Sequence, residues 1–485
     1  MRRPLSTLIG ALATFLVMAI PAHGAGPTMA FGAAEDNVRA ADLVTAKAAM
    51  TRLRLAGFTS VRMTSNWRPG LVAPTAGELQ VLRNVEGAAR LSGVKVYVSV
   101  YHPGSATTPL DATAQAEFAA YTAAIARALP SFDDVIVGNE PNLNRFWLPQ
   151  FAPDGSNASA PAYLQLLART YDALKAVDPQ LRVWGGALAP RGSDRPDGIR
   201  PTSSPTAFLK ALGIAYRASG RTVPVMDGLA FHPYPDNSSQ SPDFRHPLST
   251  TIGLADYDKL VALLGEAFDG TAQQGSSLPI LYDEFGIESI VPEGKKSLYT
   301  GTEPTTTRPV DERQQAASYD LGLRMAFCQP TVAGILFFPS EDERALASWQ
   351  SGVYYVDATP KASFWAVQDS LDRARGGSLA RCDGVALDVR LTNLRFPGPR
   401  EFLTGMRDVR FRCTYDCSWE LVATRTTTGA VAARVRGLGR YGRTLVASLK
   451  GRKLGRAPLR LSLTVVHPVN PGVPFTRASG ALRPA

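Results

Sequence analysis

Charged residues and cysteine are both scarce in this chain. Charged residues make up 19% of the sequence and hydrophobic residues 45%, which excludes a disordered chain and a coiled coil. None of the four cysteines has the paired spacing and neighbouring histidines of a zinc site. We therefore expect a globular protein that needs neither a metal nor a cofactor.

Long apolar runs are missing after the N-terminus. Arg2 and Arg3 precede an apolar run from Leu8 to Ile20, followed by a proline and small residues, which is the pattern of a secretory signal cleaved near Ala25. The run is too short for a membrane span, and no later stretch approaches about 18 uninterrupted apolar residues. We expect residues 1–24 to be a signal peptide and the mature protein to be secreted, extracellular and without a membrane span.

An oxidising compartment favours disulfide formation by the four cysteines, for which three pairings are possible. We favour Cys413–Cys417, which closes a short loop at the end of a strand. The remaining pair, Cys328–Cys382, then ties the two halves of the chain together.

Acidic residues are scarce in the last part of the chain. From Gly376 to the end, 19 Lys and Arg stand against 6 Asp and Glu, so this part carries +13 and the part before it carries −3 of the total of +10. Between Arg434 and Arg460 nine basic residues occur without an acid. Such a run is a solvated face of strands or a surface that adheres to an anionic cell-wall polysaccharide; nucleic acid is the least favoured partner, and we expect none.

Short apolar runs alternate with longer amphipathic segments eight times between residues 28 and 375. Eight βα units over about 350 residues are typical of a TIM barrel, so we predict an α/β fold with a (β/α)8 catalytic domain at residues 25–375. The expected strands are Thr28–Phe31, Ser60–Met63, Lys95–Val100, Asp134–Gly138, Arg182–Gly186, Met226–Phe231, Pro279–Tyr282 and Val332–Phe338. The expected helices are Ala40–Leu55, Ala76–Leu91, Ala112–Leu129, Ala160–Ala176, Thr206–Ala218, Tyr257–Phe268, Glu312–Phe327 and Lys361–Ala374.

The pattern changes after Gly376 to short runs in which apolar and polar residues alternate. Such runs predict a small antiparallel β-sandwich at residues 376–485, broken up at its end by Pro468, Pro471 and Pro474. The expected strands are Ala386–Val389, Asp408–Phe411, Trp419–Ala423, Val431–Val435, Arg443–Leu449 and Leu459–Val465.

Two glutamates stand where the fourth and seventh barrel strands end. Glu140 lies in the segment Gly138-Asn139-Glu140-Pro141, and Glu284 lies in Tyr282-Asp283-Glu284-Phe285. Either glutamate alone could cap a helix or pair with a basic neighbour. Together they point across one barrel mouth, and glycoside hydrolysis needs two carboxyl groups that flank one bond. We expect them to carry the chemistry.

The chain resembles clan A of the retaining glycoside hydrolases, the 4/7 superfamily of cellulase- and xylosidase-like TIM barrels. The resemblance lies in the segment Asn139-Glu140-Pro141 and in Glu284 three strands later. The resemblance covers roughly residues 28–375 and implies that Glu140 is the general acid/base and Glu284 the nucleophile. Retention by double displacement requires their carboxyl groups about 5–5.5 Å apart, and we expect this short separation.

The resemblance extends to other positions. Arg62 on the second strand matches an arginine that hydrogen-bonds the nucleophile, and His102 follows the third strand, where such enzymes often keep a histidine. His232 and Tyr234 after the sixth strand match a histidine and tyrosine pair near the nucleophile. Asn139 is expected to donate its amide to the sugar 2-hydroxyl.

Sugar sites also need aromatic side chains, because the C–H face of a pyranose packs on an aromatic ring. Trp67, Tyr101 and Trp147 follow the second, third and fourth strands and are candidates. Related enzymes place a tryptophan at the end of the eighth strand, whereas this chain has Phe338 there. We expect Phe338 or the loop residue Trp349 to take its place.

Other carboxylates compete for the catalytic roles. Strand alternation should point Asp283 away from the barrel mouth, and the acidic run at residues 341–343 reads as a solvated loop. We therefore predict a secreted retaining glycoside hydrolase, active in carbohydrate metabolism on a poly- or oligosaccharide. The alternative is a non-catalytic carbohydrate-binding or cell-wall adhesion protein that uses the barrel and the basic C-terminal domain.

Overall fold

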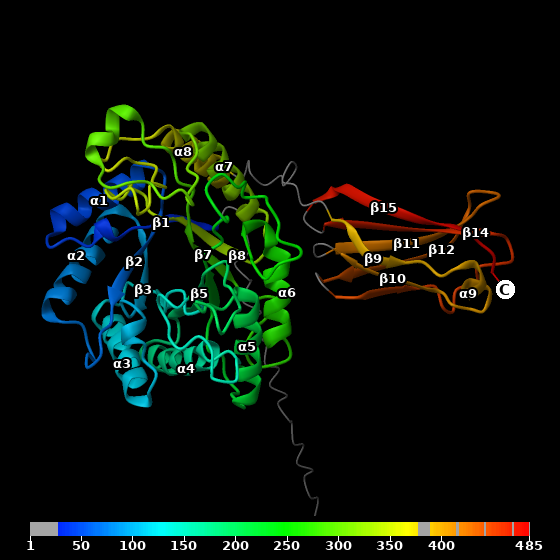
Figure 1. The fold of residues 1–485 in the computed structure, drawn as a ribbon, viewed down its shortest axis with the longest axis horizontal. Helices are drawn as coiled ribbons and strands as arrows, with labels where there is room; N and C mark the ends of the chain where they lie inside the picture. The colour runs from blue at the N-terminus through cyan, green and yellow to red at the C-terminus, as the bar shows by residue number, and fades with distance from the viewer. Residues whose placement is uncertain (1–27, 377–388, 414–416, 441–442, 468–469, 485) are drawn as a thin grey trace, which may run out of the picture.

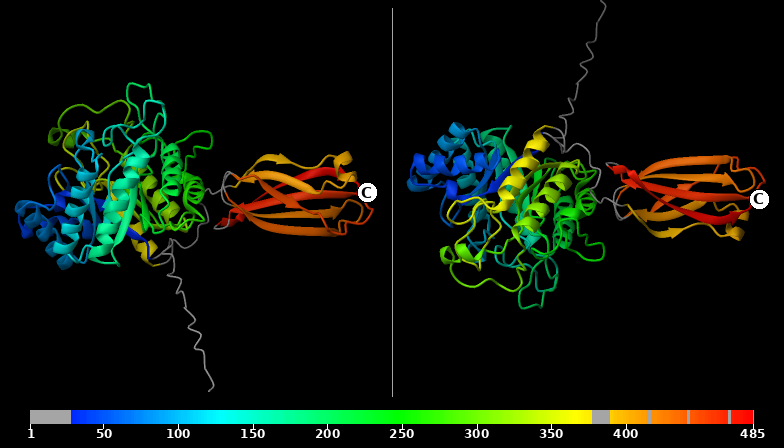
Figure 2. Two further views of the ribbon diagram at one scale, coloured as in Figure 1. Left: turned by 90° about the horizontal axis from the view of Figure 1, so that it is seen from below. Right: turned by 90° about the horizontal axis from the view of Figure 1, so that it is seen from above.

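The structure, a computed structural model, describes residues 28–376, 389–413, 417–440, 443–467 and 470–484. They form a closed barrel of eight parallel strands surrounded by helices, and a sandwich of two antiparallel sheets (Figure 1). The two units are separate bodies in the further views of Figure 2. The predicted TIM barrel followed by a β-sandwich is confirmed.

The barrel elements lie close to their predicted ranges. Its strands are β1 Ala30–Ala34, β2 Ser60–Asn66, β3 Lys95–Tyr101, β4 Asp134–Val137, β5 Arg182–Leu188, β6 Gly228–Phe231, β7 Ile280–Phe285 and β8 Val332–Phe337. Its α-helices are α1 Leu43–Leu55, α2 Ala76–Ser92, α3 Ala112–Ala128, α4 Ser159–Val177, α5 Pro205–Ala218, α6 Tyr257–Phe268, α7 Glu312–Phe327 and α8 Ala362–Arg375. The 3-10 helices are η1 Asp36–Val38, η2 Ser105–Thr107, η3 Leu254–Asp256 and η4 Glu293–Leu298.

The barrel strands follow chain order, and β8 pairs with β1 to close the ring. Gly32 of β1 has partners on both sides, Ser60 of β2 and Leu336 of β8. A Cβ at this position would lie 2.2 Å from the backbone oxygen of Ser60, so only glycine permits this close pairing. Because all eight strands are parallel, their C-terminal ends meet at one mouth.

The barrel interior is filled by buried side chains, which include Tyr97, Trp184 and Leu336. Asp134 is fully buried among them and accepts a hydrogen bond from the indole of Trp184 at 2.8 Å. Lys95 and Arg182 lie 2.7 and 2.8 Å from the same carboxylate. A packed and satisfied base of this kind leaves the mouth as the place for a site.

The sandwich contains a three-stranded sheet in the order β13-β10-β9 and a four-stranded sheet in the order β12-β11-β14-β15. Its elements are β9 Leu391–Arg395, α9 Pro399–Leu403, β10 Asp408–Cys413, β11 Cys417–Arg425, β12 Val431–Gly439, β13 Leu445–Ser448, β14 Leu459–His467 and β15 Asn470–Leu482. Strand β15 includes Pro471 and Pro474, so the prediction that these two prolines break up the end of the sandwich is wrong; Pro468 lies outside the described residues. Both prolines lie in an irregular stretch of this edge strand, between Asn470 and Phe475, where the register with β14 shifts and neither proline has a partner in that pairing.

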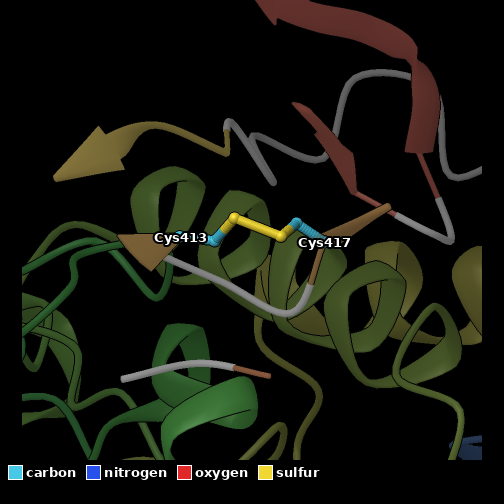
Figure 3. The surroundings of a disulfide bond; sticks show 2 residues. All are labelled: Cys413 and Cys417. Carbon is cyan, nitrogen blue, oxygen red and sulfur yellow. A yellow bond between two sulfur atoms is a disulfide. The ribbon is translucent and has the colours of Figure 1, made fainter. Parts of the chain in front are cut away.

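The predicted disulfide Cys413–Cys417 is confirmed and joins the end of β10 to the start of β11, with Cα atoms 6.3 Å apart (Figure 3). The other predicted bridge involves Cys382, which lies outside the described residues, as do the signal peptide at residues 1–24 and most of the predicted strand Ala386–Val389. Among the described residues, no helix is long and apolar enough to cross a membrane.

Candidate active site

The backbone after β4 turns sharply to present Glu140. Gly138 and Glu140 both have positive φ angles, 88° and 42°, and a non-glycine residue adopts this region at an energetic cost. The Glu140 N–H donates to the carbonyl of Ala187 at 2.8 Å, and the Glu140 carbonyl accepts from Leu143 at 2.9 Å. These bonds hold a strained conformation at the residue predicted to be the acid/base.

Strand β7 is irregular where it carries Glu284. Its register with β8 shifts between Tyr282 and Phe285, so simple alternation fails at the two residues between them. Asp283 is fully buried and lies 3.3 Å from Arg62 Nε and 3.4 Å from His232 Nε2. The prediction that Asp283 points away from the site is therefore wrong, because the irregularity places both carboxylates beside the same cations.

Arg62 joins the two predicted catalytic positions. One terminal nitrogen donates to Glu284 Oε1, and the other donates to Asn139 Oδ1 at 2.8 Å. Burial lowers the pKa of Arg62, but the charges of Glu284 and Asp283 outweigh burial and raise it, so the guanidinium stays charged. Since Asn139 accepts through its oxygen, its amide N–H groups remain the donors for a ligand.

His232 bridges three carboxylates from a fully buried position. Its Nδ1 lies 3.0 Å from Glu140 Oε1 and 3.5 Å from Glu284 Oε2, and its Nε2 faces Asp283. Burial lowers the pKa of His232, but the charges of Glu284 and Asp283 and hydrogen bonds to Asp283 and Glu140 raise it to about 10. The imidazole is therefore a cation at neutral pH.

The contacts of His232 limit the separation of the two glutamates. Glu140 Oε1 and Glu284 Oε2 share the Nδ1 atom as a neighbour, at 3.0 and 3.5 Å, and two such atoms lie no further apart than these distances added together. Carboxyl groups of retaining glycosidases are about 5–5.5 Å apart and those of inverting enzymes about 6.5–9.5 Å. This limit applies to the two facing oxygens alone, and it is compatible with the retaining separation.

Tyr234 and Trp349 stand beside Glu284. The Tyr234 hydroxyl donates to Glu284 Oε2 at 2.9 Å, and burial and the charge of Glu284 raise the pKa of Tyr234, so it remains a donor. Trp349 stacks on Tyr234 with ring centroids 5.0 Å apart and meets Phe338 edge-on at 5.4 Å. Trp349 and Phe338 are partly exposed and line the mouth, which places an aromatic wall next to Glu284.

A buried ion pair holds the loop that carries Trp349. Lys361 Nζ donates to Asp342 Oδ1 at 2.7 Å, to Ser289 Oγ at 2.9 Å and to the carbonyl of Gln350 at 2.9 Å. Both charged side chains are fully buried, so the prediction of a solvated acidic run is wrong at Asp342. The partner lysine is 19 residues away in the chain, and sequence reasoning did not find it.

Besides His232, three predicted substrate-binding residues do not reach the mouth. Trp67 is fully buried, and its indole N–H donates to the carbonyl of Leu71 at 2.8 Å. Trp147 is 2% exposed, and its ring packs edge-on against that of His102 with centroids 5.8 Å apart. His102 Nδ1 lies 2.9 Å from the carbonyl of Gly104, and burial lowers its pKa, so it is a neutral donor to backbone. All three side chains support the loops, so the prediction that they bind substrate is wrong.

Phe146 lines the mouth in place of its neighbour Trp147. Its ring meets Tyr101 edge-on with centroids 6.3 Å apart. Sequence analysis proposed Tyr101 but missed Phe146, because the loop conformation decides which of two adjacent aromatic residues faces inward. The only hint of Phe146 in the sequence was the run Arg145-Phe146-Trp147, which places two aromatic residues side by side after β4.

These residues surround a cleft of about 1440 Å³ at the C-terminal ends of the strands. Its lining includes Glu140, Glu284, Arg62, Asn139 and Tyr234. Glu140 and Glu284 are 16% and 12% exposed, so each can meet a ligand. His232 is fully buried and acts on the cleft only through the glutamates.

Comparison with protein-family models finds no match for this chain, and no curated protein matches it. Among solved structures, a GH5_18 protein from Streptomyces cattleya in complex with GlcNAc is similar at a TM-score of 0.48 and 16% identity, covering 72% of this chain and 81% of its own. A glucosidase from Croceicoccus marinus has a TM-score of 0.48 and 13% identity, covering 87% of this chain and 94% of its own.

A β-glucuronidase from Bacteroides uniformis is similar at a TM-score of 0.46 and 12% identity, over 96% of this chain. The chain spans about half the length of that enzyme, 47%. The structural neighbours thus include a protein named as a glucosidase and one named as a β-glucuronidase. These TM-scores lie below 0.5, so the fold is taken from the strand topology of this chain and the reaction is derived from its site.

Proposed function

We propose that the protein is a retaining glycoside hydrolase that cleaves O-glycosidic bonds of a poly- or oligosaccharide. The observation that carries the proposal is the pair Glu140 and Glu284, whose facing oxygens lie 3.0 and 3.5 Å from one nitrogen of His232 at the barrel mouth. Double displacement needs one carboxyl group to attack the anomeric carbon and a second to protonate the leaving oxygen, and this pair can supply both.

Glu284 is the nucleophile of the first step. Its oxygens are held separately, Oε1 by Arg62 and Oε2 by Tyr234, which orients the carboxylate for attack. Glu284 forms a bond to the anomeric carbon while the bond from that carbon to the leaving oxygen breaks. Glu140 gives its proton to the leaving oxygen, so no free alkoxide forms.

Glu140 changes role in the second step. As a carboxylate it takes a proton from water while the water oxygen attacks the anomeric carbon, and the ester to Glu284 breaks. The sugar leaves with the anomeric configuration of the substrate, and both glutamates return to their starting states. His232, which contacts both glutamates, holds their relative geometry through the cycle.

Two further groups fit the reacting sugar. The Asn139 amide is available to the 2-hydroxyl, a contact that strengthens in the oxocarbenium-like transition state. Trp349, stacked beside Tyr234, offers a platform for the C–H face of the sugar. Phe338 supports that platform rather than replacing it, since it meets Trp349 edge-on.

Turnover of aryl glycosides tests the proposal. Wild-type protein should hydrolyse at least one member of a panel of gluco, manno, galacto, xylo and arabino aryl glycosides, and Glu284→Gln should abolish that turnover. A wild type that binds sugars but hydrolyses none of the panel would favour a non-catalytic carbohydrate-binding protein.

The C-terminal sandwich supports a second element of the proposal. The nine basic residues between Arg434 and Arg460 do not form one strand face: Arg434 and Arg436 lie 3.3 and 2.5 Å from Glu420, while four others lie in the loop 449–458. This loop lies beside the connection 396–407, because Leu449 N–H donates to the carbonyl of Arg407 at 3.0 Å.

We call the loops 396–407, 426–430 and 449–458 the basic tip. Strand pairing places them at one end of the sandwich, near α9 and the C-terminus (Figure 1). They hold six basic residues and one acid, and that acid, Glu401, pairs with Arg395 at 2.5 Å. The basic residues are Arg400, Arg407, Lys450, Arg452, Lys453 and Arg456.

We propose that the basic tip binds an anionic cell-wall polysaccharide and keeps the exported enzyme near its substrate. The positive charge of the loops supports a polyanion as partner. Nucleic acid is disfavoured because the loops offer no exposed aromatic side chain on which a base could stack: Phe402 is fully buried and Phe396 is partly buried. Export itself is proposed from the N-terminal signal pattern.

A further inference from the structure

An aromatic pair and an arginine stand on the side of the cleft opposite Trp349. Tyr101 ends β3, and Phe146 and Arg145 lie on the loop after β4. The two rings are perpendicular with centroids 6.3 Å apart, and the Arg145 guanidinium lies 5.3 Å from the centre of the Phe146 ring. All three residues line the cleft, and none of them has a part in the reaction proposed above.

The loop that carries Arg145 and Phe146 is held in place by buried polar contacts. The fully buried Asn142 side chain accepts from Ala189 N–H at 3.0 Å and donates to the carbonyl of Ser203 at 3.0 Å. The carbonyl of Arg145 accepts from Ser105 N–H at 3.0 Å. A loop fixed in this way keeps its aromatic ring in position before any ligand arrives.

The order of strands decides which part of a substrate this group faces. Glu140, which must face the leaving oxygen, stands on the same loop at the end of β4. Glu284 and the wall of Tyr234, Phe338 and Trp349 come from β6, β7 and β8, across the barrel. The wall therefore contacts the sugar that becomes bonded to Glu284, and the β3–β4 group faces the leaving group.

The charge of Arg145 narrows the chemistry of that leaving group. Arg145 is exposed, and among the described residues no carboxylate forms an ion pair with it. On the β8 side of the cleft, Glu341 pairs with Arg52 at 3.2 Å and Asp342 with Lys361 at 2.7 Å. Glu343 also lines this side; it is exposed and accepts from Trp349 N–H at 3.2 Å. A guanidinium beside an aromatic platform can stack a sugar and bind a carboxylate through two parallel N–H groups.

We propose that Tyr101, Phe146 and Arg145 form a leaving-group subsite for a sugar that carries a carboxylate. The inference rests on the proposed glycosidase function, and it agrees with a polyanionic substrate held by the basic tip. Tyr101 and Phe146 bind the ring of this sugar, and Arg145 binds its carboxylate. A neutral leaving sugar would use the aromatic pair alone.

Reactivation of a trapped intermediate tests the subsite directly. A 2-deoxy-2-fluoro glycoside of the configuration accepted by the wild type leaves a stable glycosyl group on Glu284. A sugar acceptor then removes this group by transglycosylation, and to do so it must occupy the leaving-group subsite. The acceptors compared are methyl β-glucuronide and methyl β-glucoside, which differ by a carboxylate in place of a hydroxymethyl group.

Wild-type protein should be reactivated about tenfold or more faster by methyl β-glucuronide at subsaturating concentration, because a charged hydrogen-bonded pair is added. Arg145→Gln should remove that preference, so that the two acceptors reactivate it at similar rates. Phe146→Leu should slow reactivation by both acceptors. Arg191→Gln, an exposed cleft arginine that contacts Asp236 on the β5 side, is the matched control and should behave as the wild type.

Equal reactivation by the two acceptors in the wild type, or an unchanged preference in Arg145→Gln, would overturn the assignment of an anionic leaving group. Unchanged reactivation by both acceptors in Phe146→Leu would overturn the subsite itself. A wild type that hydrolyses an aryl glycoside with inversion would instead overturn the proposed retaining function, and the leaving-group subsite with it. The stereochemical result and the acceptor preference are separate measurements, so the two failures are distinguishable.

Discussion

Asp283 and Glu140 are joined through a single imidazole. His232 Nε2 lies 3.4 Å from Asp283 Oδ2, and His232 Nδ1 lies 3.0 Å from Glu140 Oε1. Burial raises the pKa of Asp283, but the charges of His232 and Arg62 outweigh burial and lower it, so Asp283 is ionised. Asp283 thus balances two buried cations that contact the catalytic glutamates, and it acts on the reaction through them.

Asp283→Asn should therefore lower the pKa of His232. Loss of an opposite charge at this distance should bring its titration to a pH about one to three units lower than the wild-type value of about 10. The chain has five histidines, so proton–nitrogen NMR of the imidazole rings can follow the most basic one. Asp134→Asn, a fully buried aspartate at the barrel base, is the control and should leave that titration in place. An unaltered titration in Asp283→Asn would show that Asp283 does not hold the charge of His232.

The cluster of His232 with Glu140, Asp283 and Glu284 makes the free energy of unfolding depend on pH. The folded-state pKa of His232 is raised from 6.5 to about 10, so its stabilising contribution is complete below about pH 6.5 and is lost as the pH rises towards 10. The free energy of unfolding of the wild type should fall over this window more steeply than that of His232→Gln. Parallel curves from urea unfolding at pH 6, 8 and 10 would contradict this.

Sequence reasoning predicted the barrel and the two glutamates because both depend on local signals. Apolar runs of strand length before amphipathic helices define the eight units, and a glutamate directly after or near the end of such a run stands at the mouth. Asp283 was misplaced because an irregular register in β7 is set by its pairing with β8. The burial of Trp147, and the exposure of Phe146 in its place, depends on loop packing that no short segment encodes.

The buried Lys361–Asp342 ion pair should stabilise the loop that carries Trp349 more than any surface ion pair does. Lys361→Met leaves a buried aspartate without its cation and should cost about 3–5 kcal/mol of unfolding free energy. The double variant Lys361→Met/Asp342→Leu removes both charges and should recover much of that loss. In variants that remain folded, KM should rise more than kcat falls, because the Trp349 platform is displaced. Equal stability of the two variants would contradict the ion-pair explanation.

The basic tip should account for most of the attraction of the sandwich to a polyanion. Replacing Lys450, Arg452, Lys453 and Arg456 with Gln should weaken binding to immobilised polygalacturonate at low salt by about tenfold or more. The remaining affinity should depend less on the salt concentration. The matched control replaces four strand-face arginines with Gln, Arg410, Arg412, Arg434 and Arg436, and changes the net charge equally. If both variants lose the same affinity, total charge is responsible and the tip is not a binding surface.

Replacement of Glu140 and replacement of Glu284 should impair turnover in different ways. Glu140→Ala should lower kcat/KM by about 10²–10⁴ for substrates with poor leaving groups and far less for activated aryl glycosides, since only the former need a proton. Glu284→Ala should lose turnover, and azide should restore it by forming a glycosyl azide of inverted configuration in the vacated space. A Glu284→Ala enzyme that azide rescues with retained configuration would exchange the two roles.

Proton NMR of the first sugar released by the wild type, recorded before mutarotation, measures the stereochemistry of the reaction directly. Double displacement between Glu140 and Glu284, whose facing oxygens both contact Nδ1 of His232, predicts release of the same anomer as the substrate. Release of the opposite anomer would contradict the retaining mechanism, and Glu284 would then have to act as a general base on water.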